Sequence, residues 1–85
     1  MPPQNVKRIM EKEKRLDELS VGECGVVENL IVCGSMRRRL LDIGFTRGTT
    51  VLCVGKSPLG DPTAYLVRGC KIAIRQRDAH GIVLK

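Results

Sequence analysis

Aromatic residues are almost absent from this sequence. It contains no tryptophan, one phenylalanine (Phe45) and one tyrosine (Tyr65) among its 85 residues. A hydrophobic core must therefore be built from valine, leucine, isoleucine and cysteine. A chain of this length forms one small domain and buries only about 60% of the surface that its unfolded state exposes. We expect a single domain with a small margin of stability.

Long apolar segments are also missing. No apolar run approaches the roughly 20 residues needed to cross a bilayer. The first residues lack the apolar centre of a secretory signal peptide. We therefore expect a cytosolic protein that does not insert into the membrane. Cytosolic thiols stay reduced, so disulfide bonds are not expected.

No combination of residues typical of an enzyme is present. The acidic residues are scattered or stand beside basic ones, so no pair is arranged for acid–base catalysis. The glycines match neither phosphate-binding pattern, GxxxxGK[ST] or GxGxxG. Cys70 and His80 lie near each other in sequence, but no third group is available to orient them. We expect a non-catalytic binding protein without a cofactor.

Four cysteines raise the question of a metal site or a thiol sensor. Zinc ligands usually occur in pairs two to four residues apart, whereas the closest cysteines here are nine apart. Cys53 lies in the apolar run 51–54, where a free cysteine behaves as a small hydrophobic residue. The spacing favours structural cysteines and no bound metal. A thiol- or metal-sensing role stays open for the remaining candidates: Cys24, Cys33, Cys70 and His80.

One short helix is well signalled. Ser35 suits the N-cap because its hydroxyl can accept a hydrogen bond from a free amide of the first turn. Gly44 suits the position just after the helix, and Phe45 can then pack back on the last turn. Between these ends runs an apolar stripe at helical spacing: Met36, Leu40 and Ile43.

The charges on this helix are oriented against its dipole. Arg37, Arg38 and Arg39 lie in the first turn and Asp42 in the last, an arrangement that costs a few tenths of a kcal/mol for each charge. The arginines are either a solvated face, with an Arg38–Asp42 ion pair worth a few tenths of a kcal/mol, or a docking surface. Three successive arginines span roughly two hundred degrees of the helix, so they cannot all point at one partner.

Runs of aliphatic and β-branched residues predict strands around the helix. One helical turn is expected at residues 16–19, and a single tight turn at residues 75–80. Residues 1–15 read as an N-terminal extension, frayed or partly helical, ahead of a domain formed by residues 16–85. The pattern predicts a mostly β protein, a small, partly open barrel of about five strands with one inserted helix. The strands are expected at residues 24–31, 49–54, 63–67, 72–74 and 81–84.

The net charge is +6, of which residues 19–85 contribute +5, and such a balance suits an acidic partner. Small barrels that bind single-stranded nucleic acid stack the bases on aromatic side chains, and here Tyr65 alone could do so. The competing interpretation is a protein-docking domain. Arginine is enriched at protein interfaces because its planar fork packs and donates several hydrogen bonds.

Three separated motifs occur in order between residue 16 and the end of the chain. They are Leu16-x-x-Leu19-x-x-Gly22-Glu23-x-Gly25-x-Val27, Arg38-Arg39-Leu40-Leu41-Asp42-Ile43-Gly44-Phe45-Thr46-x-Gly48-Thr49 and Pro58-Leu59-Gly60-Asp61-Pro62. Together these motifs resemble the FeoA-like proteins. The resemblance implies an SH3-like β-barrel with a helix inserted after the first strand. It also implies a small cytosolic accessory of bacterial ferrous-iron uptake that works with a FeoB-type membrane transporter and its cytosolic GTP-binding domain. The N-terminal extension and the cysteines lie outside the family pattern.

Charge and resemblance together predict a docking surface for the cytosolic part of such a transporter. The inserted helix and the proline-bounded loop would contribute Met36, Arg37, Arg38, Arg39, Leu59, Gly60 and Asp61. Nucleic-acid binding and thiol or metal sensing are the alternatives. A homo-oligomer formed through a free sheet edge also stays open. Tight Fe(II) binding is not expected, because no ligand cluster is visible in the sequence.

Overall fold

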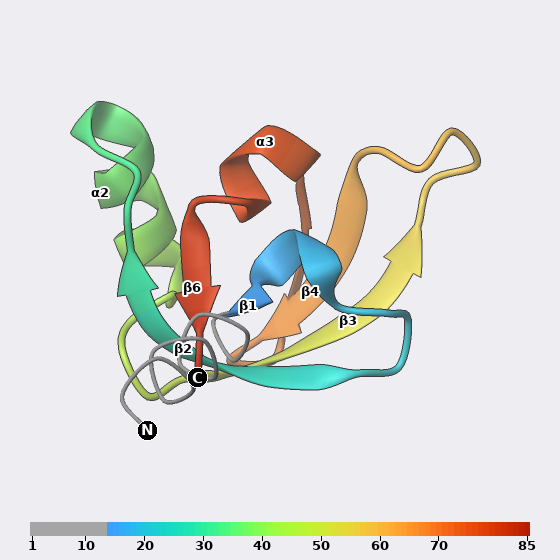
Figure 1. Cartoon of the computed structure of the whole chain (residues 1–85), viewed down its shortest axis with the longest axis horizontal. Helices are drawn as coiled ribbons and strands as arrows, with labels where there is room; N and C mark the ends of the chain where they lie inside the picture. The colour runs from blue at the N-terminus through green and yellow to red at the C-terminus, as the bar shows by residue number, and fades with distance from the viewer. Residues whose placement is uncertain (1–13) are drawn as a thin grey trace, which may run out of the picture.

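The computed structural model describes residues 14–85, whose strands form one antiparallel sheet. Its strands follow the order β1-β6-β2-β3-β4-β5, so β1 and β5 stand at the two edges and the barrel is open. Figure 1 shows the sheet curling around the centre of the molecule. The mostly β architecture predicted from the sequence is therefore confirmed. The strands are β1 (Lys14–Arg15), β2 (Cys24–Leu30), β3 (Thr50–Lys56), β4 (Thr63–Val67), β5 (Cys70–Ile74) and β6 (Ile82–Leu84).

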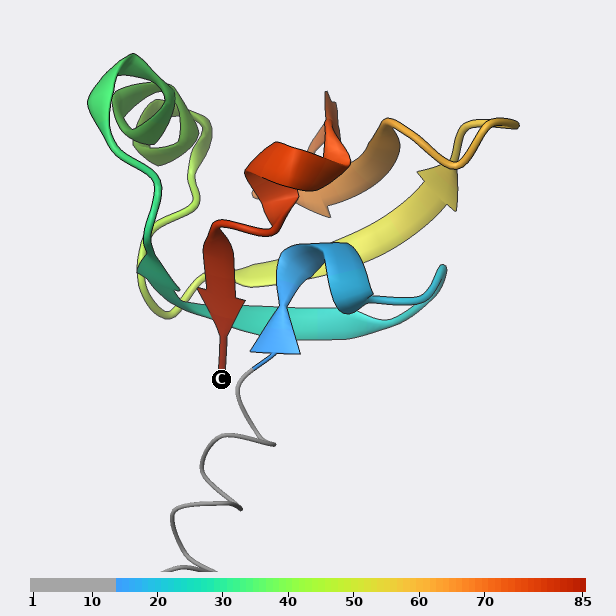
Figure 2. The ribbon, with the colours of Figure 1, turned by 45° about the horizontal axis from the view of Figure 1, so that its top comes forward.

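Three short helical segments connect these strands. The 3₁₀ turn η1 (Leu16–Glu18) follows β1, the helix α2 (Gly34–Ile43) joins β2 to β3, and α3 (Gln76–Ala79) joins β5 to β6. Figures 1 and 2 show α2 at one end of the molecule, the loop between β3 and β4 at the opposite end, and α3 between them. Within residues 14–85, no helix combines the length and the apolar character that crossing a bilayer requires.

Two short elements differ from the sequence-based expectation. Lys14 and Arg15, which the sequence pattern assigns to the extension, pair with Leu84 and Val83 as strand β1. Residues 75–80 contain one turn of helix rather than a simple tight turn. Both elements are too short for hydrophobic periodicity to reveal them. The rest of the predicted extension, residues 1–13, lies outside the described residues.

The core contains both aromatic side chains as well as the expected aliphatic residues. Phe45 is fully buried, Tyr65 is 1% exposed, and Cys53 is buried among the aliphatic side chains as predicted. The hydroxyl of Tyr65 donates a hydrogen bond to the carbonyl of Leu16, at 3.4 Å. The prediction that Tyr65 could stack on a base is therefore wrong. Buried on the inner face of the sheet, its ring cannot reach a ligand.

The chain enters α2 along a closely packed path. The N–H of Ile31 donates to the carbonyl of Gly81, at 2.8 Å. A Cβ atom on Gly81 would overlap the side chain of Val32, so this position requires glycine. The hydrogen bond and the close packing hold the segment before α2 against the turn that follows α3. They therefore help to fix the position at which the helix begins.

Candidate docking surface

The helix α2 is held to the barrel by the apolar stripe that its sequence predicts. Leu40 is buried in the core, and Met36 and Ile43 are partly buried against it. The predicted end of the helix is also confirmed. Gly44 adopts a φ of +128°, and its N–H donates to the carbonyls of Leu40 and Leu41, both at 3.1 Å. These contacts fix one face of the helix and leave the opposite face exposed.

The start of α2 differs from the prediction. The helix begins at Gly34 and its N-cap position is Cys33, whose side chain makes no capping hydrogen bond. Gly34 has a φ of +71°, which glycine adopts readily, and it turns the chain into the helix one residue before Ser35. The assignment of Ser35 as N-cap is therefore wrong. No side-chain cap offsets the positive end of this helix dipole.

Arg37, Arg38 and Arg39 are all exposed and have no acidic partner within residues 14–85. The possible ion pair between Arg38 and Asp42 is not formed. Three cations therefore lie on the first turn, where the helix dipole is also positive. The charge of this surface is not neutralised by residues 14–85 and is available to an acidic partner.

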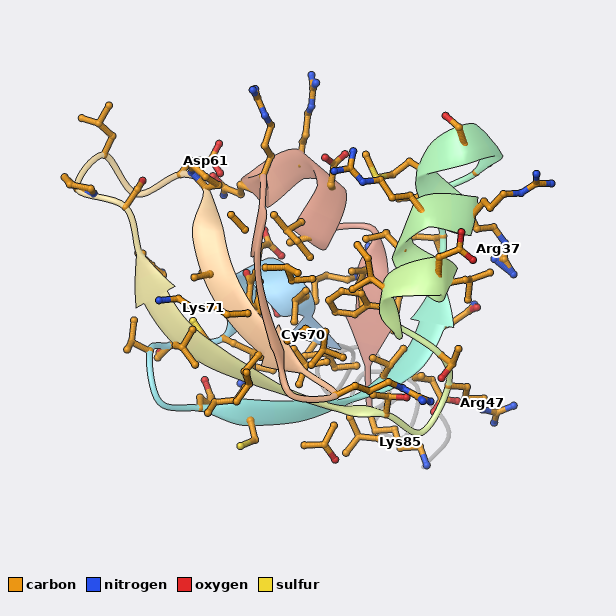
Figure 3. All side chains as sticks on the ribbon, turned by 180° about the vertical axis from the view of Figure 1, so that it is seen from behind. Arg37, Arg47, Asp61, Cys70, Lys71 and Lys85 are labelled. Atoms are coloured by element: carbon orange, nitrogen blue, oxygen red, sulfur yellow. The ribbon has the colours of Figure 1, made fainter. Side chains whose placement is uncertain are left out.

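The arginines point to different sides of α2, as their spacing predicts. Arg37 and Arg38 line a hollow of about 290 Å³ whose floor includes Leu41, a leucine that is 38% exposed. Arg37 also borders a groove of about 570 Å³ between α2 and β2, which reaches Ile31. Figure 3 shows Arg37 directed away from the barrel. We refer to Arg37, Arg38, Leu41 and Ile31 as the α2 face.

Met36 and Arg39 lie on the other side of the helix. They line a second groove, of about 550 Å³, between α2 and the edge strand β5. Met36 is partly buried there, so it does not share a surface with Arg37. The predicted helical part of the docking surface is thus divided between two neighbouring grooves.

The predicted loop residues lie far from α2. Figure 3 shows Arg37 and Asp61 at opposite ends of the molecule. Leu59 is 94% exposed at the tip of the loop, and Gly60 closes a turn by donating its N–H to the carbonyl of Ser57, at 2.8 Å. The carboxylate of Asp61 accepts a hydrogen bond from the N–H of Gln76, at 2.7 Å, at the start of α3. The helix and the loop therefore do not form one continuous surface.

His80 has a partner that the sequence does not reveal. Its Nδ1 lies 3.3 Å from each carboxylate oxygen of Asp17, and its carbonyl accepts a hydrogen bond from Nη1 of Arg15, at 2.7 Å. Sixty-three positions separate His80 from Asp17, and they meet because η1 packs against α3. Only a correct three-dimensional fold could have identified this pair.

No metal centre is built by the part of the chain that the structure describes. Within residues 14–85, no three histidine, cysteine, aspartate or glutamate side chains gather closely enough to hold an ion. Cys53 is buried, while three free cysteines are exposed: Cys24, Cys33 and Cys70.

Among residues 14–85, Tyr65 and Glu23 have shifted pKa values, and both side chains contribute to the fold. Burial raises the pKa of Tyr65 to about 12. Glu23 accepts hydrogen bonds from the Lys14 ammonium and from the N–H of Ser20, each at 2.9 Å, and these lower its pKa. Tyr65 lies in the core, and Glu23 lies in the segment between η1 and β2. Neither is placed as an acid or base beside a ligand site.

A protein-family model covers the described part of the chain. The model of the FeoA domain matches residues 14–85. The chain belongs to the FeoA domain family. The resemblance found in the three sequence motifs is thereby confirmed.

Individual relatives agree with this assignment. The chain is 35% identical over 65 residues to the Fe(2+) transport protein A/Fe(2+) transporter FeoB fusion protein of Porphyromonas gingivalis. That match covers 76% of this chain and 8% of the fusion protein, so the chain spans a small fraction of that relative's length.

Solved structures match over most of the chain. FeoA of Chlorobium tepidum has a TM-score of 0.79 at 32% identity, covering 84% of this chain and 68% of that one. FeoA of Stenotrophomonas maltophilia, solved with zinc and described as a procaryotic SH3 domain protein, has a TM-score of 0.76 at 30% identity, covering 85% and 89%. The open barrel of this chain is therefore an SH3-like FeoA fold.

Proposed function

We propose that this FeoA-family chain is a non-catalytic accessory protein of ferrous-iron uptake. It acts by docking on the cytosolic part of a FeoB-type membrane GTPase transporter. The observation that carries the proposal is the relative in which Fe(2+) transport protein A and the transporter FeoB are fused in one polypeptide. Two domains joined in one chain meet at high effective concentration, which is consistent with an interaction between the separate proteins.

The α2 face supplies the contact in this proposal. Its arginines are exposed and unpaired within residues 14–85, and its apolar residues Leu41 and Ile31 are 38% and 55% exposed. Arginine around a partly apolar centre is the composition expected of a protein interface. An acidic surface on the transporter would complement it.

Leu59 forms a second, smaller contact in the proposal. Its side chain is almost fully exposed, and it belongs to the loop between β3 and β4, which lies at the end of the molecule opposite α2 (Figure 1). A partner that reaches both regions must pass over α3, which lies between them. Asp61 belongs to this loop, but its carboxylate is already bonded to α3, so its part in docking is to hold the loop in place.

The test measures the affinity of the full chain for the purified GTP-binding domain of a FeoB-type transporter. We expect the double variant Arg37→Glu/Arg38→Glu to bind at least about tenfold more weakly, because the reversed charges would repel an acidic surface. Both side chains are exposed, so the fold should be unchanged. The wild-type affinity should also fall as salt concentration rises.

A matched control is provided by Lys56→Glu/Lys85→Glu. These exposed residues lie outside the α2 face, and their reversal changes the net charge by the same amount. The control variant should bind within about threefold of wild type. Equal affinity of the α2 double variant and wild type, with both folded, would remove the α2 face from the interface.

A further inference from the structure

The strand β5 leaves one side of its backbone unpaired among the described residues. It is the last strand of the sheet, and β4 is its one partner. Figure 3 shows β4 on one side of β5 and α2 on the other. An edge strand with free N–H and C=O groups is a template for pairing with a further strand.

The register identifies which groups are free. Arg68 and Gly69, with φ of +51° and +80°, form a two-residue turn, and the pair that closes it is Val67 with Cys70. Hydrogen-bonded and non-bonded pairs alternate along an antiparallel ladder. Cys70, Ile72 and Ile74 therefore direct their backbone groups toward β4. Lys71 and Ala73 direct theirs to the open side.

The open side faces the second groove beside α2. This groove, of about 550 Å³, has β5 as one wall and α2 as the other. Met36, Ile43 and Ile72 contribute partly buried apolar surface. Its volume falls within the range of roughly 300–1,000 Å³ that is usual for ligand sites, enough for a few residues of an extended chain.

The rim of the groove is strongly basic. Arg39, Arg75 and Arg77 line it and are exposed, against one acidic residue, Asp78. No ion pair within residues 14–85 occupies the three arginines. An acidic segment lying in the groove would meet cations from both walls, because Arg39 comes from α2 and the other two flank or belong to α3.

We propose that the edge of β5 accepts an extended acidic segment of the partner protein, which adds to the sheet as a further strand between β5 and α2. Main-chain hydrogen bonds to Lys71 and Ala73 give the affinity, and carboxylates pairing with Arg39, Arg75 and Arg77 give the preference for acidic sequences. The identity of the partner rests on the proposed function, whereas the mode of binding does not.

A second copy of this chain is a poorer occupant. Pairing two β5 strands edge to edge would bring Lys71 and the two basic rims of the grooves together. Like charges at such short range oppose association. A lysine on an edge strand is one of the devices by which proteins discourage self-pairing.

The test is an NMR measurement of amide hydrogen exchange on the full chain. The probe is a capped heptapeptide of alternating glutamate and valine, and its control carries lysine in place of glutamate. With the acidic probe, we expect exchange of the amides of Lys71 and Ala73 to slow at least tenfold, while Ile72, already bonded to β4, changes little. Unchanged exchange of Ala73 at saturating probe would overturn the proposal.

A variant tests the same contact independently. Ala73→Pro removes an outward N–H that β4 does not use, and proline is tolerated at such edge positions. We expect it to weaken probe binding about tenfold, the effect of losing a main-chain hydrogen bond. Ala73→Val retains the N–H and should bind like wild type. Equal binding by the proline and valine variants would exclude strand addition.

The transporter's GTP-binding domain then separates the two proposals. If it binds wild type and Ala73→Pro equally, strand addition by the partner is wrong and the proposed function stands. If it binds neither while the probe still protects Ala73, the proposed function is wrong and strand addition stands. A concentration-dependent dimer of wild type that is lost in Ala73→Pro would identify a second copy as the occupant and overturn the acidic segment.

Discussion

The two ends of this small barrel treat their polar groups differently. Toward the loop before β4, two acidic side chains bind other parts of the protein: Asp61 accepts a hydrogen bond from the N–H of Gln76, and Asp17 lies against His80. On the α2 face, Arg37 and Arg38 have no such partner within residues 14–85. The contacts of Asp61 and His80 stabilise the fold, whereas Arg37 and Arg38 retain their charge for another molecule.

The two kinds of polar group affect the free energy of folding in opposite directions. A polar group bonded within the protein contributes roughly 0.5–1.5 kcal/mol to folding. Cations at the start of a helix reduce its stability slightly. The α2 face therefore carries a small cost that an external anionic partner would offset, whereas substitutions of Asp17 and Asp61 should mainly affect stability.

The largest expected effect concerns Tyr65 at high pH. Its pKa is about 10 when exposed and about 12 in the fold, so the folded state holds the proton more tightly. The contribution of the protonated Tyr65 to the free energy of unfolding is therefore fully present below pH 10 and is lost as the pH rises toward 12. Over that range the free energy of unfolding falls by up to about 1.4 kcal/mol per pH unit.

Tyr65→Phe should remove this part of the pH dependence. Urea unfolding of both proteins at pH 8 and pH 11 measures it, since other groups contribute equally to each. We expect the stability gap between wild type and variant to shift in favour of the variant at pH 11. A gap that is the same at both pH values would contradict burial of this hydroxyl.

A smaller loss of stability is expected at Asp61. Asp61→Ala removes the acceptor at the start of α3 and should lower the free energy of unfolding by about 1 kcal/mol. Leu59→Ala, two residues away at an exposed position, is the control and should change it by less than about 0.5 kcal/mol. Chemical denaturation compares the two. Equal effects would mean that the Asp61 bond contributes nothing measurable.

The smallest effect is expected on α2. Arg38→Gln removes a cation that has no acidic partner within residues 14–85. It should leave stability unchanged or raise it by a few tenths of a kcal/mol. Thermal and urea unfolding at low ionic strength, where the dipole effect is strongest, are the appropriate measurements. A clear destabilisation would show that Arg38 makes an interaction important to the fold, and would weaken the contrast between the two ends.

Local signals in the sequence were sufficient for α2 and for most of the sheet. The stripe through Leu40 and the glycine at position 44 describe interactions within one turn, and both are confirmed. The run of aliphatic and β-branched residues at 63–67 likewise locates β4 without reference to the rest of the chain. Such features need no knowledge of distant residues, which explains why they are predictable.

The errors concern contacts between distant segments or competing local geometries. Gly34, not Ser35, determines where α2 begins, because its positive φ turns the chain first. Tyr65 is buried because β4 passes under η1, which the sequence pattern does not show. Contacts between distant segments also explain the missed partner of His80. They explain as well the separation of Asp61 from Arg37, which divides the predicted surface (Figure 3).

The contrast between the two ends can be tested directly by mapping a complex. NMR spectra of the full chain, recorded with and without the GTP-binding domain of a FeoB-type transporter, would report which residues change. We predict that the signals of Arg37, Arg38 and Leu41 shift or broaden most, while those of Asp17 and His80 change little. Changes confined to η1 and α3, with α2 unaffected, would contradict the assignment of α2 as the docking face.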